Sequence, residues 1–169
     1  VCSSDLKKRA YLLNHFLEQF RGTVFRQTMF AEFEMIVHGR VGEGESLTSD
    51  KLSEIYYDLN KKYYGEDIVI DEAIAMEWAR IPHFYRPFYV YKYATGFSAA
   101  ISLSQQILQE GEPAVLRYLE FLGGGSSDYP INLLQKAGVD MSKPEPIVQA
   151  MALFDELLSE LEHLADTKL

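Results

Sequence analysis

The residues best suited to chemistry lie close together between positions 81 and 93. This segment reads Ile-Pro-His-Phe-Tyr-Arg-Pro-Phe-Tyr-Val-Tyr-Lys-Tyr, with one histidine, four tyrosines and one arginine around two prolines. Imidazole and phenol groups donate hydrogen bonds to an oxygen that gains negative charge during a reaction, and the loss of one such donor costs about 3 kcal/mol of transition-state stabilisation. The two prolines leave the chain few conformations, which favours a preorganised site.

The same composition also fits an aromatic packing cluster, and composition alone favours that interpretation. Tyrosine rings bury readily, and a buried hydroxyl needs only one hydrogen-bond partner. Tyr89 and Tyr93 lie one helical turn apart, which is the spacing of side chains that touch on one helix face. The residues by themselves leave both interpretations open.

Metal-binding patterns elsewhere in the sequence are weak. A peptidase-type zinc helix needs two histidines one turn apart with a glutamate beside the first, and no such pair occurs among His15, His38, His83 and His163. Glu160 and His163 have the spacing used in di-iron bundles, but the second copy that such a site needs is missing. Glu34 and His38 are four residues apart, and we expect a solvated helical pair there rather than a metal site.

Composition narrows the classes of partner. Because the net charge is −9, the chain does not attract a phosphate backbone, and we expect no nucleic-acid partner. No apolar run approaches the roughly 18 residues of a membrane span, so no membrane partner is expected either. The single cysteine, Cys2, excludes an internal disulfide and a cysteine-based zinc site, which fits a cytoplasmic location.

The elements that must position the segment 81–93 are helices, because apolar residues recur at helical spacing along most of the chain. We expect a long helix interrupted at Gly22, an N-cap at Thr48, and first helical positions at Pro87 and Pro113. Only Ile68, Val69 and Ile70 could pass for a strand, so the predicted fold class is all-α. The expected helices cover residues 7–38, 48–65, 71–81, 87–111, 113–123, 131–137 and from about 146 onward.

Several blocks of the sequence resemble the oligoendopeptidase F family of zinc metallopeptidases. The first block, residues 11–34, reads Tyr-Leu-Leu-Asn-His-Phe-Leu-Glu-Gln-Phe-Arg-Gly-Thr-Val-Phe-Arg-Gln-Thr-Met-Phe-Ala-Glu-Phe-Glu. The others are residues 81–85, residues 88–96 with Phe-Tyr-Val-Tyr-Lys-Tyr-Ala-Thr-Gly, and Ser-Asp-Tyr-Pro at 127–130. They occur in the family's order, and the similarity extends from about residue 7 to the end.

The resemblance implies the helical C-terminal part of a thermolysin-motif, zincin-like oligopeptidase catalytic domain. Members of the family cleave short peptides with a water bound to zinc, which a His-Glu-x-x-His helix and a later glutamate hold. By the same resemblance, His83 and Tyr91 are expected to stabilise the oxyanion, and His83, Tyr85 and Tyr91 to bind substrate. The matching position of Arg86 varies in the family, so no catalytic role is expected for it.

The zinc motif is absent from these 169 residues, and the resemblance implies that the ligands lie upstream of Lys7. We therefore expect residues 7–169 to be the C-terminal helical portion of the catalytic domain, with no zinc bound, inactive alone, and partnered by the missing N-terminal half of the same polypeptide. Residues 1–6, Val-Cys-Ser-Ser-Asp-Leu, resemble a translated sequencing adapter and are expected to be a non-native scar. The alternative is a non-enzymatic helical module that binds peptides or a small ligand.

Overall fold

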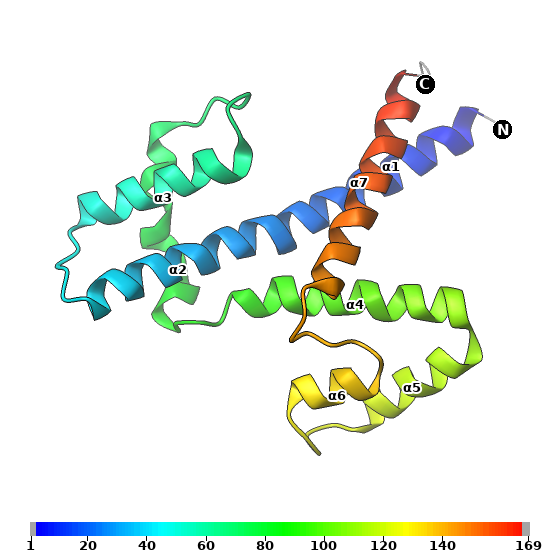
Figure 1. The fold of residues 1–169 in the computed structure, drawn as a ribbon. Coiled ribbons are helices and arrows are strands. Elements are labelled where there is room, and N and C mark those ends of the chain that lie inside the picture. Colours follow the sequence, from blue (N-terminus) through cyan, green and yellow to red (C-terminus); the bar gives the residue numbers. More distant parts are fainter. Residues whose placement is uncertain (1–2, 167–169) are drawn as a thin grey trace. The chain divides into compact units, whose positions relative to one another are not determined.

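The computed structural model describes residues 3–166, which form helices joined by turns (Figure 1). No strand occurs among these residues, so the all-α prediction is confirmed and the stretch 68–70 is not a strand. None of the described helices is long and apolar enough to cross a membrane. The elements in chain order are α1 (Ser3–Phe20), the π-helix η1 (Arg21–Phe25), α2 (Arg26–Gly42), α3 (Ser49–Tyr64), the 3-10 helices η2 (Glu72–Arg80) and η3 (Pro82–Tyr85), α4 (Tyr91–Glu110), α5 (Glu112–Gly123), α6 (Pro130–Lys136) and α7 (Glu145–Asp166).

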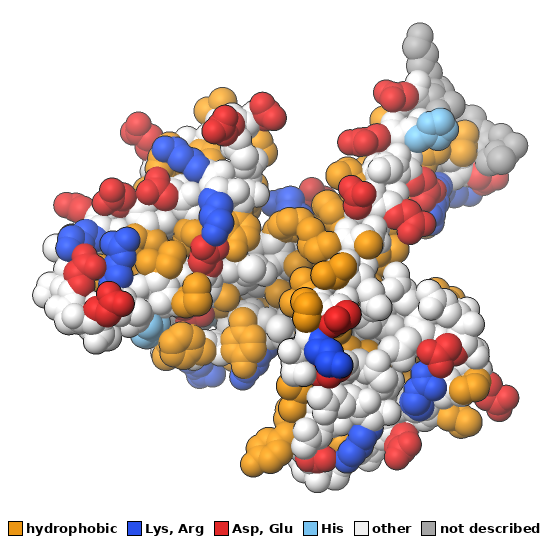
Figure 2. Space-filling model, in the orientation of Figure 1, with side chains coloured by type: hydrophobic (Ala, Val, Ile, Leu, Met, Phe, Trp, Pro, Cys, Tyr) orange, Lys and Arg blue, Asp and Glu red, His pale blue; other side chains and the backbone are white. Residues whose placement is uncertain are grey.

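The helices divide into two compact units. Unit 1 takes its residues from the two ends of the chain, up to Arg21 and from Thr95 on, and unit 2 comprises Gly22–Ala94. In unit 1, α1 packs against α7. The ring of Phe20, at the end of α1, is fully buried and lies 5.5 Å from Phe97 and 4.8 Å from Phe154, measured between ring centroids. Acidic side chains occur along the C-terminal part of α7, where Asp155, Glu156 and Glu162 are exposed (Figure 2).

Unit 2 contains the whole segment 81–93. Its core combines residues of α2, α3 and the segment itself: Met29, Phe30, Phe33, Ile55, Tyr56, Leu59, Ile81 and Val90. The predicted N-cap at Thr48 is confirmed, since its hydroxyl accepts a hydrogen bond from the Lys51 amide at 3.4 Å. Because Ile81 and Val90 are both buried, the two ends of the exposed stretch between them are anchored in this core.

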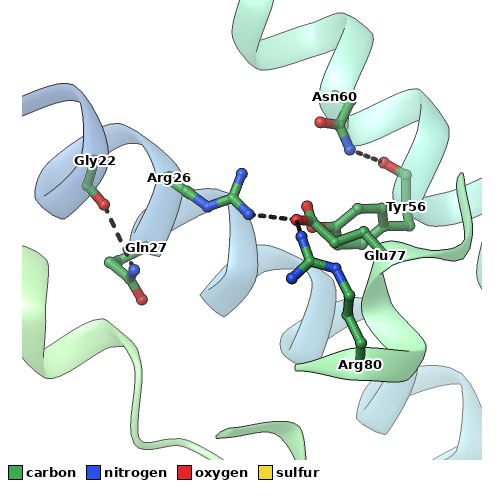
Figure 3. Close-up of polar contacts among 7 residues, drawn as sticks. All are labelled: Gly22, Arg26, Gln27, Tyr56, Asn60, Glu77 and Arg80. Carbon is green, nitrogen blue, oxygen red and sulfur yellow. Dashed lines mark hydrogen bonds and ion pairs between the residues drawn. The ribbon is translucent and has the colours of Figure 1, made fainter. Parts of the chain in front are cut away.

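A buried carboxylate joins three elements of unit 2 (Figure 3). Glu77 of η2 accepts hydrogen bonds from the Tyr56 hydroxyl of α3 at 2.7 Å and from Arg26 of α2 at 2.7 Å, and it also pairs with Arg80. Only 5% of the Glu77 side chain is exposed. Burial would raise the pKa of Glu77, but the hydrogen bonds from Tyr56 and Arg26 and the charges of Arg26 and Arg80 outweigh it and hold this pKa below its ordinary value.

The long helix predicted through Gly22 is present, and the expected interruption takes the form of a π-helical turn over Arg21–Phe25 between α1 and α2. One local prediction is corrected. Pro87 is not a first helical position: it lies in a turn, and α4 begins at Tyr91. The residue after it, Phe88, has a φ of 60°, which an α-helix does not allow.

Substitution of Glu77 tests the buried carboxylate. Glu77→Gln should lower the free energy of unfolding by about 2–3 kcal/mol at neutral pH, because it leaves Arg26 partly buried without its counter-charge. Trp78, the only tryptophan in the chain, lies next to Glu77 and provides the fluorescence signal for denaturation. The control is Glu45→Gln, which removes an exposed ion pair with Lys51 and should leave the midpoint unchanged.

The pH dependence of the same variant has a defined sign. Since the pKa of Glu77 is depressed by folding, its contribution is present above the unfolded-state pKa and is lost as the pH falls through the folded-state value. The difference in unfolding free energy between wild type and Glu77→Gln should be constant near neutral pH and shrink below about pH 4. An equal difference from pH 7 down to pH 3 would contradict the assignment.

Candidate functional site

The histidine and two tyrosines of the segment form a cluster of rings. His83, in η3, is partly buried, and its ring stacks on that of Tyr89 with a centroid distance of 5.9 Å and an angle of 19° between the planes. Tyr93 meets both rings edge-on, at 6.1 Å from His83 and 5.6 Å from Tyr89. A hydrogen bond with Tyr89 raises the pKa of Tyr93, which agrees with the close contact of the two rings. The contact predicted between Tyr89 and Tyr93 is therefore confirmed.

Two residues of this cluster also border an open hollow. His83 and Tyr89 line a surface hollow of about 330 Å³ together with Pro82 and Arg86. The imidazole thus has aromatic neighbours that hold its plane and a free space that a bound molecule can enter. The segment can therefore be both an aromatic packing cluster and a preorganised site, because packing orients the His83 ring while the ring still faces solvent.

The other two predicted residues, Tyr85 and Tyr91, are exposed. Tyr91 is the first residue of α4 and is 47% exposed, and Tyr85 ends η3 and is 81% exposed. Tyr85 also lines an apolar pocket of about 200 Å³ with Phe33 and Trp78 among its walls. Tyr89 stacks on His83 but was not among the predicted site residues, although its spacing of four from Tyr93 was a signal for a shared cluster.

The turn between η3 and α4 has an unusual backbone. Phe88 is the one non-glycine residue with a positive φ among those described, and such a conformation costs about 1–2 kcal/mol. Its N–H donates a hydrogen bond to Oε1 of Glu34 in α2, at 3.1 Å. The ring of Phe88 also packs on that of His38, with 4.9 Å between centroids.

Glu34 is buried, so the prediction of a solvated pair with His38 is wrong. Only 3% of Glu34 is exposed, and its Oε2 has no hydrogen-bond partner among the described residues. Burial raises the pKa of Glu34, while the Phe88 hydrogen bond and the charges that His38 and His83 can carry oppose the rise. Helical periodicity could not reveal this, because the surroundings of Glu34 include residues far away in the sequence, among them Trp78, Phe84 and the Phe88 amide.

The described residues do not form a metal centre. Within residues 3–166, no group of three His, Cys, Asp or Glu side chains is placed to hold a metal ion. Glu34 and His38 together offer two donor groups, fewer than the three protein ligands of a catalytic zinc site.

Comparison with known proteins gives the family of the chain first. The sequence pattern of Peptidase family M3 matches residues 2–153, so the chain belongs to this family. It is 62% identical over 160 residues to Oligopeptidase PepF of Bacillus subtilis (strain 168) and 48% identical over 164 residues to the plasmid-encoded Oligoendopeptidase F of Lactococcus lactis subsp. cremoris. The resemblance to oligoendopeptidase F is thereby confirmed.

A solved structure agrees with the sequence matches. The oligoendopeptidase-F from Enterococcus faecium superposes with a TM-score of 0.94 at 50% identity, over 96% of this chain and 31% of that one. The two sequence relatives cover 95% and 97% of this chain, but only 24% and 27% of their own lengths. The chain therefore spans about a quarter of the relatives it matches.

Removal of the Tyr89 ring tests the stacking on His83. In Tyr89→Leu, the NMR signals of the His83 ring protons should shift, because the ring current of the stacked phenol is lost. Tyr89→Phe keeps the ring and should largely preserve those signals. Tyr57→Leu, which removes a tyrosine elsewhere in unit 2, serves as the control; equal shifts in the Tyr57 and Tyr89 variants would disprove the stack.

Proposed function

We propose that this chain is the C-terminal helical part of a zinc-dependent endopeptidase that hydrolyses short peptides in the cytoplasm. The observation that carries the proposal is the position of His83: it lines an open hollow, and aromatic contacts hold its ring, in a chain of Peptidase family M3. The names of the relatives, oligopeptidase and oligoendopeptidase, support peptides as the substrate class.

Hydrogen-bond donation is the role of the site residues in this proposal. The His83 imidazole and the Tyr91 hydroxyl donate to the scissile carbonyl oxygen as it gains negative charge, which lowers the barrier to attack on that carbonyl. Tyr85, which is highly exposed beside an apolar pocket, binds the substrate chain together with these two. His83 therefore acts both in binding and in catalysis.

The metal belongs to another part of the enzyme in this proposal. The described residues of this chain do not fit a zinc site, so in a protein as long as its relatives the remaining part of the polypeptide would contribute the ligands, and zinc would supply Lewis-acid chemistry there. The chain alone is then inactive. Its partners are short peptides and that remaining part of the polypeptide, with no nucleic acid or membrane.

Kinetics of a full-length enzyme test the two donors. Residues 7–169 replace the matching region of Oligopeptidase PepF from Bacillus subtilis, which is 62% identical. In this enzyme Tyr91→Phe should lower kcat by about 100-fold or more with little change in KM, because the hydroxyl acts mainly on the transition state. His83→Ala should lower kcat by about as much and also raise KM, because His83 binds substrate as well.

The zinc content and the melting temperature of both variants should match the wild type. Tyr57→Phe, on α3, is the control and should keep full activity. Unchanged turnover in Tyr91→Phe would remove this residue from the mechanism, whereas lost zinc would point to a structural effect.

The zinc content of the isolated chain and of the full-length enzyme tests where the metal ligands lie. The purified 169-residue chain should contain no stoichiometric zinc after dialysis, while the full-length enzyme described above should retain about one ion per molecule and lose activity on chelation. Stoichiometric zinc in the isolated chain would refute the assignment of the ligands to another part of the polypeptide.

A further inference from the structure

We propose that Glu34 is a positioning residue for the candidate site, acting through the backbone of Phe88. Its carboxylate holds Phe88 in the left-handed conformation, and this conformation sets where α4 starts and where Tyr89 and Tyr91 lie relative to His83. The effect on turnover rests on the proposed function, whereas the contact with Phe88 can be measured independently of it.

The backbone of Phe88 requires an external restraint. A phenylalanine rarely adopts a φ of 60°, and the preceding residue, Pro87, has no N–H to donate. The Phe88 N–H instead donates to Oε1 of Glu34 at 3.1 Å. This contact comes from α2, 54 residues earlier in the chain, so it fixes the turn against the body of unit 2.

The second contact comes from the same helix. His38 lies one turn after Glu34, and its ring packs on the Phe88 ring with 4.9 Å between centroids. Two residues of α2 therefore hold one residue of the turn, one by its amide and the other by its side chain. This arrangement gives the spacing of Glu34 and His38 a role that requires no metal.

Burial of the Glu34 carboxylate costs desolvation free energy, which an apolar side chain at this position would not. It is 97% buried, and its Oε2 has no hydrogen-bond partner among the described residues. The carboxylate accepts the hydrogen bond from the Phe88 N–H, and an apolar residue at this position could not accept it.

The turn determines the ring cluster directly. Tyr89 follows Phe88 and stacks on His83, and the first turn of α4 begins with hydrogen bonds from the amides of Lys92 and Tyr93 to the carbonyls of Tyr89 and Val90. A rotation at Phe88 would therefore move Tyr89 from His83 and change the direction in which Tyr91 leaves the turn.

Amide hydrogen exchange on the 169-residue chain tests the contact. In the wild type, the Phe88 amide should exchange slowly although it lies outside any helix. Glu34→Leu preserves the buried volume without an acceptor and should speed this exchange by about tenfold or more, while Glu34→Gln keeps an acceptor and should remain close to wild type. A wild-type Phe88 amide that exchanges like an unprotected one overturns the proposal without any variant.

Kinetics of the enzyme carrying residues 7–169 in the Bacillus subtilis relative test the consequence. Glu34→Leu should lower kcat by about tenfold, with KM within about threefold and no loss of melting temperature, and Glu34→Gln should restore kcat. Glu32→Leu, on the same helix but paired with Lys62 and Tyr63, should change neither exchange at Phe88 nor kcat.

These results are distinguishable from failure of the proposed function. An enzyme that is inactive before any substitution at Glu34 speaks against the proposed function, and hydrogen exchange still decides the contact. Full turnover in Glu34→Leu overturns the positioning role, as does a Glu34→Gln variant that is folded and as slow as Glu34→Leu.

Discussion

The carboxylate of Glu77 is the interaction on which unit 2 depends. It pairs with Arg26 of α2, Tyr56 of α3 and Arg80 of its own helix, so one buried acid joins the three elements that surround the core. A 3-10 helix has poorer hydrogen-bond geometry than an α-helix and gains little stability alone. The position of η2 is therefore set by side chains: this network, and Trp78, whose indole N–H donates to Ser53 at 3.1 Å.

The placement of η2 fixes the start of the candidate segment. Directly after η2, Ile81 enters the core, and Val90 enters it again just before α4, so the exposed turn between them has both ends held by burial. Within that turn, the contact of Phe88 with Glu34 and the stack of Tyr89 on His83 determine its path. The buried charge of Glu77 thus positions η2, the burial of Ile81 and Val90 holds the ends of the turn, and the turn then orients the His83 ring.

Local rules predicted the helices well and the turn poorly. Apolar periodicity and the cap at Thr48 depend on neighbouring residues, so they can be read along the chain. Gly22 marked an interruption, but whether the backbone breaks or forms a π-helical turn depends on packing. Pro87 satisfied the rule for a helix start, yet Phe88 overrode it because its amide is held by Glu34, far away in sequence. The candidate residues His83, Tyr85 and Tyr91 were predicted from the family resemblance. Periodicity could not predict them, because it describes only neighbouring residues and not contacts between distant parts of the chain.

The exposure of the candidate site bears on the hydrogen-bonding role that we propose for its residues. A hydrogen bond to a developing oxyanion is strong only where water is excluded, because water competes for the same oxygen and screens its charge. In this chain His83 borders an open hollow and Tyr91 is half exposed, so in the proposed role both side chains would compete with solvent for the oxyanion. Unit 2 orients the backbone and the rings. A low-dielectric environment would in addition require other groups to cover these side chains and exclude water, so orientation and exclusion of water are separate requirements.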